Sequence, residues 1–230
     1  MVTRIYLVRH AEAEGNVQEF FQGSLDTDLT EKGLRQLDYL AERFRGIPIE
    51  ALYCSPYRRT RLTADAVNRF HGLPVNYDAE LREISGGAWE GRRWKELPDA
   101  FPAAYQAWTQ HMAAFQAPSG DAMRDVWNRM IAVMTRIAQE CRGKTAAVVS
   151  HGCALRNFLC YVESGDMERL GDVGWADNTA VSLVEYDTET GWRLVFKNDA
   201  AHLPTAFSTL RSSVWNRYER TGAQPDGQGR

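Results

Sequence analysis

The chain has 230 residues, and its 27 Lys and Arg against 30 Asp and Glu give a net charge of −3. A chain of this length buries roughly 70% of its unfolded surface on folding, so its core needs no disulfide or metal. The small net charge and the lack of a basic run argue against nucleic acid or an anionic membrane as the main partner. Length and composition therefore favour one globular α/β domain.

The four cysteines are Cys54, Cys141, Cys153 and Cys160, and none forms a C-x-x-C pair. Each lies in an apolar stretch, which predicts buried free thiols in a reducing compartment. The sequence enters a strand at once without a charged and apolar leader, and no apolar run approaches about 18 residues. We therefore expect a cytoplasmic protein that has no membrane partner.

Two kinds of apolar pattern define the expected elements. Short runs rich in β-branched and aromatic residues predict strands, and apolar positions three or four residues apart predict helices. Thr30 is the expected N-cap of one helix and Ser55 that of the next. In chain order, the expected elements are a strand at 2–8, an irregular loop at 12–28, a helix from Thr30 to Phe44, a strand at 51–54, a helix at 57–70, a strand at 74–77, a glycine-rich loop at 81–92, one or two helices at 93–117, a helix at 121–141, a strand at 144–149, a helix at 153–163, and strands at 181–186 and 192–196.

The alternation of strands and helices predicts the fold class. We expect an α/β protein with a single doubly wound, mostly parallel sheet that is flanked by helices on both faces. Residues 93–120 are expected to form a helical lid or insertion over the C-terminal edge of the sheet. The domain is expected to span residues 1–218, and the polar residues 219–230 are expected to be a disordered tail.

Two of the predicted strands end in a histidine. The first runs into Arg9 and His10, and the strand at 144–149 runs into His151. Ligand sites in open α/β sheets lie beyond the carboxyl ends of the strands, so the two imidazoles are expected at one crevice. The other charged candidates for this crevice are Arg58, Arg59, Arg61 and Glu83.

These residue types suit phosphoryl transfer through a phosphohistidine. A neutral imidazole can attack phosphorus when its other nitrogen donates to a carbonyl that fixes the tautomer. Guanidinium groups match the geometry and the charge of phosphoryl oxygens, and a carboxylic acid can protonate the leaving alkoxide. With two guanidiniums and a second imidazole supplying positive charge, this chemistry needs no metal.

Several short motifs follow one another along the chain. They are Arg9-His10 with Asn16, Gln22-Gly23 with Asp26 and Leu29-Thr30, Ser55-Pro56-Tyr57-Arg58-Arg59 with Thr63-Ala64, Leu81-Arg82-Glu83, Gly87-Ala88-Trp89-Glu90-Gly91, Pro118-Ser119-Gly120-Asp121, and Val149-Ser150-His151-Gly152. In this ordered set the chain resembles the histidine phosphatase (phosphoglycerate mutase-like) superfamily. The Gly-Ala-Trp-Glu-Gly segment is similar to the phosphatase branch of that superfamily.

The resemblance implies a role for nine residues and implies no metal or cofactor. His10 is the expected nucleophile that becomes phosphorylated. Glu83 is the expected acid for the leaving group and then the base for the attacking water. The expected binding residues are Arg9, Arg59 and His151 for the phosphoryl oxygens, Asn16 and the Gly152 amide as further donors, and Gln22 and Gly23 at the mouth of the pocket.

Four places depart from the family's pattern. Ala11 follows the nucleophile where the family has Gly, so this turn is expected to avoid a positive φ. Ala13 replaces a Thr, Phe20 replaces an Arg that many members carry, and Asp121-Ala122 replaces Glu-Ser. These changes lie at the edges of the pocket, so they bear on substrate identity and not on the phosphohistidine step.

The residues leave alternatives open. A metal hydrolase would use His10, Glu12, His151 and Cys153, although their spacing suits a tetrahedral site poorly. A non-catalytic phosphate-binding module would have lost the nucleophile or the acid. An ion pair with the adjacent Arg82 would explain Glu83 without a catalytic role.

A phosphatase and a mutase are harder to separate. A cofactor-dependent phosphoglycerate mutase must hold a second anionic group, which calls for cations between Glu83 and the long helix. That region offers Arg93 and Lys95 near its start and is otherwise rich in Ala, Gln, Phe and Trp. We therefore expect a metal-independent phosphomonoesterase whose partner is a small phosphorylated metabolite, with phosphoglycerate mutase as the alternative. A monomer and a homo-oligomer are equally compatible with the sequence.

Some histidines and aromatic residues could have either a structural or a functional role. Aromatic residues on helices more often pack in a core or a lid than line a pocket. For His202, a role in packing or gating is the less favoured interpretation. The aromatic residues concerned are Trp89, Tyr105, Trp108 and Phe115.

Overall fold

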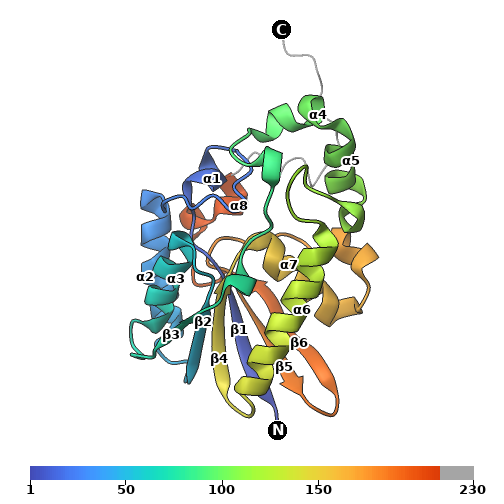
Figure 1. Ribbon diagram of the computed structural model, residues 1–230. Helices are drawn as coiled ribbons and strands as arrows, with labels where there is room; N and C mark the ends of the chain where they lie inside the picture. Colours follow the sequence, from blue (N-terminus) through green and yellow to red (C-terminus); the bar gives the residue numbers. More distant parts are fainter. Residues whose placement is uncertain (213–230) are drawn as a thin grey trace.

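The computed structural model of the chain describes residues 1–212 (Figure 1), so the tail expected at 219–230 lies outside the described residues. Within them, one sheet has the strand order β3-β2-β4-β1-β5-β6. Its strands are β1 (Thr3–Arg9), β2 (Ala51–Cys54), β3 (Val75–Tyr77), β4 (Thr145–Ser150), β5 (Val181–Asp187) and β6 (Gly191–Asp199).

The first strand of the chain lies in the middle of the sheet. β1 pairs in parallel with β4, with Arg4 opposite Thr145, and antiparallel with β5, with Thr3 opposite Tyr186. β2 pairs in parallel with both β3 and β4, and β6 pairs antiparallel with β5. The α/β fold with a single, mostly parallel sheet is therefore confirmed, and β5 is the strand that runs against the others.

Helices cover both faces of the sheet because its central strands are apolar on both sides. In β1, Ile5 and Leu7 pack against α6 (Met123–Glu140) and α7 (Gly152–Ser164), while Val8 packs against the opposite layer. That layer contains α2 (Glu31–Phe44) and α3 (Arg58–Asn68). Side chains alternate between the faces of a strand, so continuous apolar strands are typical of a sheet that is covered twice.

The N-termini of α2 and α3 test the two expected N-caps. Thr30 Oγ1 accepts a hydrogen bond of 2.9 Å from Gly33 N at the start of α2, which confirms its role as N-cap. The prediction for Ser55 is wrong, because the N-cap residue of α3 is Tyr57, which makes no side-chain cap. The Ser55 hydroxyl contacts His151 instead.

A helical lid follows the glycine-rich loop, as expected. It contains α4 (Leu97–Ala100) and α5 (Pro102–Gln110), flanked by 3-10 turns at Trp94–Glu96 and Met112–Ala114. In Figure 1, α4 and α5 lie at the end of the molecule opposite the N-terminus, beyond the sheet. On the other side of that end, the loop expected at 12–28 includes one helical turn, α1 (Glu14–Val17).

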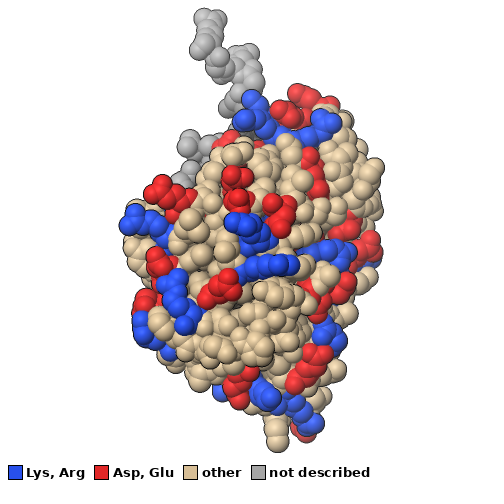
Figure 2. Space-filling view, turned by 60° about the vertical axis from the view of Figure 1, so that its left-hand side comes forward, with Lys and Arg blue, Asp and Glu red and all other residues tan. Residues whose placement is uncertain are grey.

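The chain after the sheet returns to the same end of the molecule. A 3-10 turn at Thr205–Phe207 leads into α8 (Thr209–Ser212), which lies beside α1 in Figure 1. The sequence patterns predict neither element. Figure 2 shows basic and acidic side chains interspersed on the face that it draws. In the described part of the chain, no helix is long and apolar enough to cross a membrane, and all four cysteines are buried free thiols.

Candidate active site

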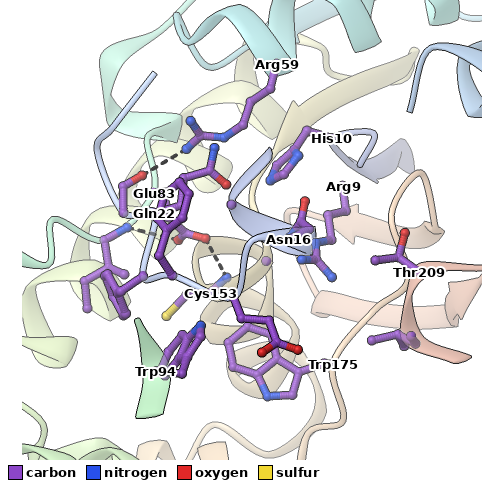
Figure 3. Close-up of a pocket in the computed structure, with 18 of the residues that line it drawn as sticks. Arg9, His10, Asn16, Gln22, Arg59, Glu83, Trp94, Cys153, Trp175 and Thr209 are labelled. Carbon is purple, nitrogen blue, oxygen red and sulfur yellow. Dashed lines mark hydrogen bonds between the residues drawn. The ribbon is translucent and has the colours of Figure 1, made fainter. Parts of the chain in front are cut away.

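A cavity of about 100 Å³ opens at the carboxyl ends of β1 and β4. Eight of the nine residues singled out from the sequence line it, and these are Arg9, His10, Asn16, Gln22, Gly23, Arg59, Glu83 and Gly152. The ninth, His151, is fully buried beside it, with its ring centroid 5.3 Å from that of His10. The fold thus brings all nine residues together from five separate stretches of the chain. Figure 3 labels Arg9, His10, Asn16, Gln22, Arg59 and Glu83 among them.

His10 is held as a neutral imidazole with one free nitrogen. Its Nδ1 lies 2.8 Å from the carbonyl oxygen of Ala11. Because a carbonyl oxygen only accepts, Nδ1 carries the proton and the lone pair is on Nε2. Burial, followed by the charges of Arg59 and Arg9, lowers the pKa of His10 well below its ordinary value. The ring is therefore neutral at physiological pH.

Several elements fix the backbone around His10. His10 N donates to Ser150 O at the end of β4, and Asn178 Nδ2 donates to His10 O at 2.8 Å. Ala11 N donates to Thr63 Oγ1 of α3 at 3.0 Å. Ala11 itself is not among the residues with positive φ, as expected from the missing glycine.

Arg59 and His151 form a buried pair beside His10. Arg59 Nε donates to His151 Nδ1 at 3.2 Å, so the neutral His151 ring carries its proton on Nε2 and donates to Ser55 Oγ at 2.7 Å. Burial and then the charge of Arg59 lower the pKa of His151 well below its usual range. Burial also lowers the pKa of Arg59 to about 10, so its guanidinium stays charged at neutral pH.

Arg9 offers a buried donor to the cavity. Its Nη1 donates to Ala176 O, whereas its Nε is buried and has no hydrogen-bond partner within residues 1–212. Burial lowers the pKa of Arg9, and the charges of Asp177 and Glu83 oppose that effect. A buried N–H without a partner is costly, and an anionic ligand oxygen would satisfy it.

Glu83 is fixed at the N-terminus of α7. Its Oε1 accepts from Ile84 N at 2.9 Å and from Ala154 N at 3.0 Å, and its Oε2 accepts from Cys153 N at 3.0 Å. Arg82 instead pairs with Glu80 at 3.4 Å. The alternative of an Arg82–Glu83 ion pair is therefore wrong, and the Glu83 carboxylate lines the cavity (Figure 3).

The loop that carries Glu83 is anchored from two sides. Ser150 Oγ at the end of β4 donates to Leu81 O at 2.7 Å. Arg129 on α6 donates through Nη1 to the carbonyl oxygens of Glu80 and Arg82, at 2.6 and 2.8 Å. These bonds tie the Glu83 loop to β4 and α6, on the same frame as the histidines.

The remaining candidates line the rim. Asn16 Oδ1 accepts from Ala13 N at 2.9 Å, which leaves its Nδ2 as a donor. Gln22 Nε2 donates to Thr27 Oγ1, and Gly23 O accepts from Arg59 Nη2 at 2.9 Å. Gly152 begins α7, where a Cβ would lie 3.3 Å from both Arg9 Nε and a ring carbon of Trp175.

Other lining residues come from the expected lid and from two segments that sequence patterns do not single out. Trp94 and Trp108 enter from the lid, Trp175 from the loop before β5, and Thr209 and Leu210 from α8. Trp108 has both of the roles open to it, since it lines the cavity and packs in the core. Loops and terminal segments carry no periodic pattern, so no sequence signal places them at the site. The cations of the lid, Arg93 and Lys95, are exposed and do not line the cavity.

The residues expected for a metal hydrolase do not form a metal site. Glu12 is turned to Thr30 and Thr209, whose hydroxyls donate to its two carboxylate oxygens at 2.8 and 2.7 Å. Across residues 1–212, no three His, Cys, Asp or Glu side chains lie together in a way that could hold a metal ion.

Comparison with known proteins identifies the family. The sequence model of the histidine phosphatase superfamily, branch 1, matches residues 5–200. The chain belongs to the histidine phosphatase superfamily. A phosphoserine phosphatase of Hydrogenobacter thermophilus is 28% identical over 81% of this chain and 88% of its own length. A probable phosphoglycerate mutase of Citrobacter koseri is 30% identical, over 87% of this chain and 94% of its own length.

Solved structures of this superfamily share the fold. YhfR of Bacillus stearothermophilus superposes with a TM-score of 0.83 at 28% identity, covering 87% of this chain and 98% of its own. A mycobacterial glucosyl-3-phosphoglycerate phosphatase gives a TM-score of 0.77 at 26% identity, covering 87% and 100%. The resemblance recognised in the sequence is thus confirmed.

Proposed function

We propose that the chain is a metal-independent phosphomonoesterase that acts on a small phosphorylated metabolite through a phosphohistidine on His10. The observation that carries this proposal is the state of His10: a neutral ring in the wall of a cavity, with its proton on Nδ1 and its lone pair on Nε2. Arg9 and Arg59 line the same cavity. Phosphatases among the relatives support the same activity.

In the first step, the Nε2 lone pair of His10 attacks phosphorus and forms a P–N bond. The bond between phosphorus and the ester oxygen breaks, and its electrons stay on that oxygen. Glu83 gives the leaving oxygen its proton, so that an alcohol departs. Arg9 and Arg59 stabilise the charge on the three phosphoryl oxygens.

In the second step, water attacks the phosphorus of the phosphohistidine. Glu83, now ionised, takes a proton from the water. The P–N bond breaks, its electrons return to Nε2 of His10, and inorganic phosphate leaves. Because two guanidiniums supply the positive field, we expect a chelator to leave the activity unchanged, and loss of activity on chelation that added metal restores would contradict this.

A phosphoglycerate mutase remains the second candidate, because relatives as similar as the phosphatases carry that name. A mutase must hold a second anion after the first transfer. Arg93 and Lys95 are exposed and lie outside the cavity lining, which favours hydrolysis. Isomerisation of 3-phosphoglycerate that depends on 2,3-bisphosphoglycerate, in place of phosphate release, would favour the mutase.

The test is His10→Ala, with His111→Ala on the exposed end of α5 as its control. Phosphate release should fall about a thousandfold or more in His10→Ala, because the nucleophile is lost. The wild type should also retain acid-labile phosphate when it is quenched during turnover, and His10→Ala should not. Activity near that of the wild type in His10→Ala would contradict the mechanism. Binding of phosphate by the wild type without turnover would indicate a non-catalytic phosphate-binding module.

A further inference from the structure

The cavity has two chemically different ends. In Figure 3, His10, Arg9 and Arg59 lie on one side, and Trp94 and Trp175 lie on the other. Trp108 also lines the cavity, as does Leu210 from α8. The phosphoryl group belongs at the charged end, so the part of the substrate that leaves as an alcohol faces the indole rings.

The indole end is a packed surface. Phe21, Trp94 and Trp108 contact one another, with centroid distances of 5.3 Å for Phe21 and Trp94, 5.6 Å for Phe21 and Trp108, and 5.8 Å for the two indoles. Trp108 stacks on Trp175 at 6.2 Å, with 28° between the ring planes. Arg156 covers Trp175 with its guanidinium 4.6 Å from the ring centroid. Rings that brace one another in this way offer a preformed apolar wall, which favours flat apolar ligands.

The lining offers little to a second anion. Arg9 and Arg59 are the Lys and Arg residues among the lining side chains of the described chain, and both are needed for the phosphoryl oxygens. Arg59 already donates to His151, to Leu25 O at 2.6 Å and to Gly23 O at 2.9 Å. A carboxylate next to the indoles would therefore be desolvated without a lining cation to pair with it, since the Arg156 guanidinium on Trp175 lies outside the lining and donates to Val173 O and Gly171 O.

The mouth carries a negative charge near the same end. Glu19 lines the cavity, is exposed, and has a φ of 57°, a conformation that side chains other than glycine and asparagine rarely adopt. Glu19 O accepts from Trp94 N at 3.0 Å, which ties this strained turn to the lid. A carboxylate on the substrate would meet this charge as it enters.

Resting on the proposed function, we infer that the substrate is the phosphate ester of an aromatic or similarly flat apolar alcohol without a carboxylate. The substrates named for several relatives, phosphoserine and phosphoglycerate derivatives, carry a carboxylate. This chain therefore differs from those relatives in the group that it receives at the indole end.

The test compares benzyl phosphate, ethyl phosphate, O-phosphoserine and 3-phosphoglycerate. All four release alkoxides, so each requires proton donation by Glu83. We expect kcat/KM for benzyl phosphate to exceed the other three values by about tenfold or more, since a buried ring gains more than a small alkyl group. A value for O-phosphoserine or 3-phosphoglycerate that equals or exceeds the benzyl value overturns the inference.

Trp94→Ala tests whether the indole end binds the leaving group of the substrate without taking part in the chemical step. It should raise KM for benzyl phosphate about tenfold and leave kcat/KM for ethyl phosphate nearly unchanged. Trp192→Ala is the matched control, because Trp192 is also a half-buried indole but packs on Phe158 and Tyr186, away from the cavity. Equal losses on both substrates in Trp94→Ala would contradict the inference.

Glu19→Gln tests the charge at the mouth. It should raise kcat/KM for O-phosphoserine several-fold relative to benzyl phosphate. Glu14→Gln, on an exposed residue of α1 outside the lining, should not change this ratio. If Glu19→Gln also leaves the ratio unchanged, the role given to Glu19 is wrong.

The outcomes distinguish this inference from the proposed function. Turnover of the carboxylate-bearing esters that depends on His10, with poor turnover of benzyl phosphate, keeps the phosphatase and overturns the substrate class. Failure of the wild type to release phosphate from any of the four overturns both.

Discussion

The two histidines of the site carry their protons on opposite ring nitrogens. Ala11 O fixes the proton of His10 on Nδ1, and the guanidinium of Arg59 fixes that of His151 on Nε2. Of the two rings, only that of His10 has a nitrogen without a protein partner in the described structure, because both nitrogens of His151 are engaged. The division of roles between two identical side chains therefore follows from their neighbours.

The acid role of Glu83 gives a prediction at the same scale. Glu83→Gln keeps the shape of the side chain but removes the proton donor. Hydrolysis of alkyl phosphates should fall about a hundredfold, and hydrolysis of aryl phosphates should fall much less, because an activated leaving group needs little protonation. Steady-state kinetics on ethyl and p-nitrophenyl phosphate measure the difference.

Glu80→Gln is the control for this pair of assays, because Glu80 is exposed in the same loop and its carboxylate pairs with Arg82 outside the cavity. It should retain both activities. Losses of equal size on the two substrates in Glu83→Gln would remove Glu83 from the acid role.

A glycine on α2 supports the loop that follows the nucleophile. A Cβ at Gly33 would lie 2.0 Å from Glu12 O. Gly33→Ala should therefore destabilise the fold by about 3 kcal/mol, because helix and loop must separate. Urea unfolding measures this effect, and phosphate release should fall with it because Glu12 lies two residues after His10.

Gly46→Ala is the matched change, since nothing lies within 4 Å of a Cβ at that position. It should be neutral or stabilise the fold by about 0.5 kcal/mol through the unfolded chain. If the two variants unfold at the same urea concentration, the close approach at Gly33 does not control stability.

At the scale of elements, side chains bind the segment after the sheet to α2, to the loop before β5 and to the loop after His10. Asp177 Oδ1 accepts from Thr209 N at 2.9 Å, Gln36 Nε2 donates to Phe207 O at 2.7 Å, and Lys32 Nζ donates to Ser208 O at 3.1 Å. Thr209 Oγ1 donates to the buried Glu12 carboxylate at 2.7 Å. These contacts hold a wall of the cavity in place.

Thr209→Val removes the hydroxyl and keeps the shape. It should cost about 2 kcal/mol of folding free energy, because a hydrogen bond to a buried carboxylate is lost. KM should rise more than kcat falls, since Thr209 lines the cavity but does not enter the chemistry. Denaturant unfolding and steady-state kinetics test the two effects, and Thr188→Val at an exposed position should show neither.

Some elements could be predicted from the sequence, and others could not, for a physical reason. The strands that deliver His10 and His151 are apolar on both faces, and this pattern is local and strong. Trp175 and Leu210 reach the cavity only through long-range packing, so nothing in their own neighbourhoods marks them. At Ser55, a local pattern predicts the wrong role. Its position before Pro56 is typical of a helix cap, but its hydroxyl contacts His151.

At the scale of the molecule, three buried histidines make stability depend on pH. Burial and neighbouring cations lower the pKa values of His10 and His151, and burial lowers the pKa of His202 to about 4. Below about pH 6.5, histidines in the unfolded chain are protonated while those in the native state stay neutral. Proton binding therefore favours the unfolded state, and the free energy of unfolding should fall as the pH decreases toward about 4. Urea unfolding at about pH 7 and about pH 5 measures this loss.

His202→Gln isolates one of these groups outside the cavity. His202 contacts Thr179 Oγ1 at 3.1 Å and Arg43 Nη1 at 3.4 Å. The variant should lose less stability between the two pH values than the wild type, because one titrating group is gone. A pH dependence identical to that of the wild type would show that His202 does not contribute.

The placement of β1 has a consequence for how the chain reaches this state. It is synthesised before both of its partners, β4 and β5, whose paired residues begin at Thr145 and end at Tyr186. The backbone N–H and C=O groups along its two edges therefore stay without strand partners on the ribosome until the chain has been made through Tyr186, and long-range pairing of this kind slows folding. Chaperone dependence during translation is the expected cost of placing His10 at the end of this strand.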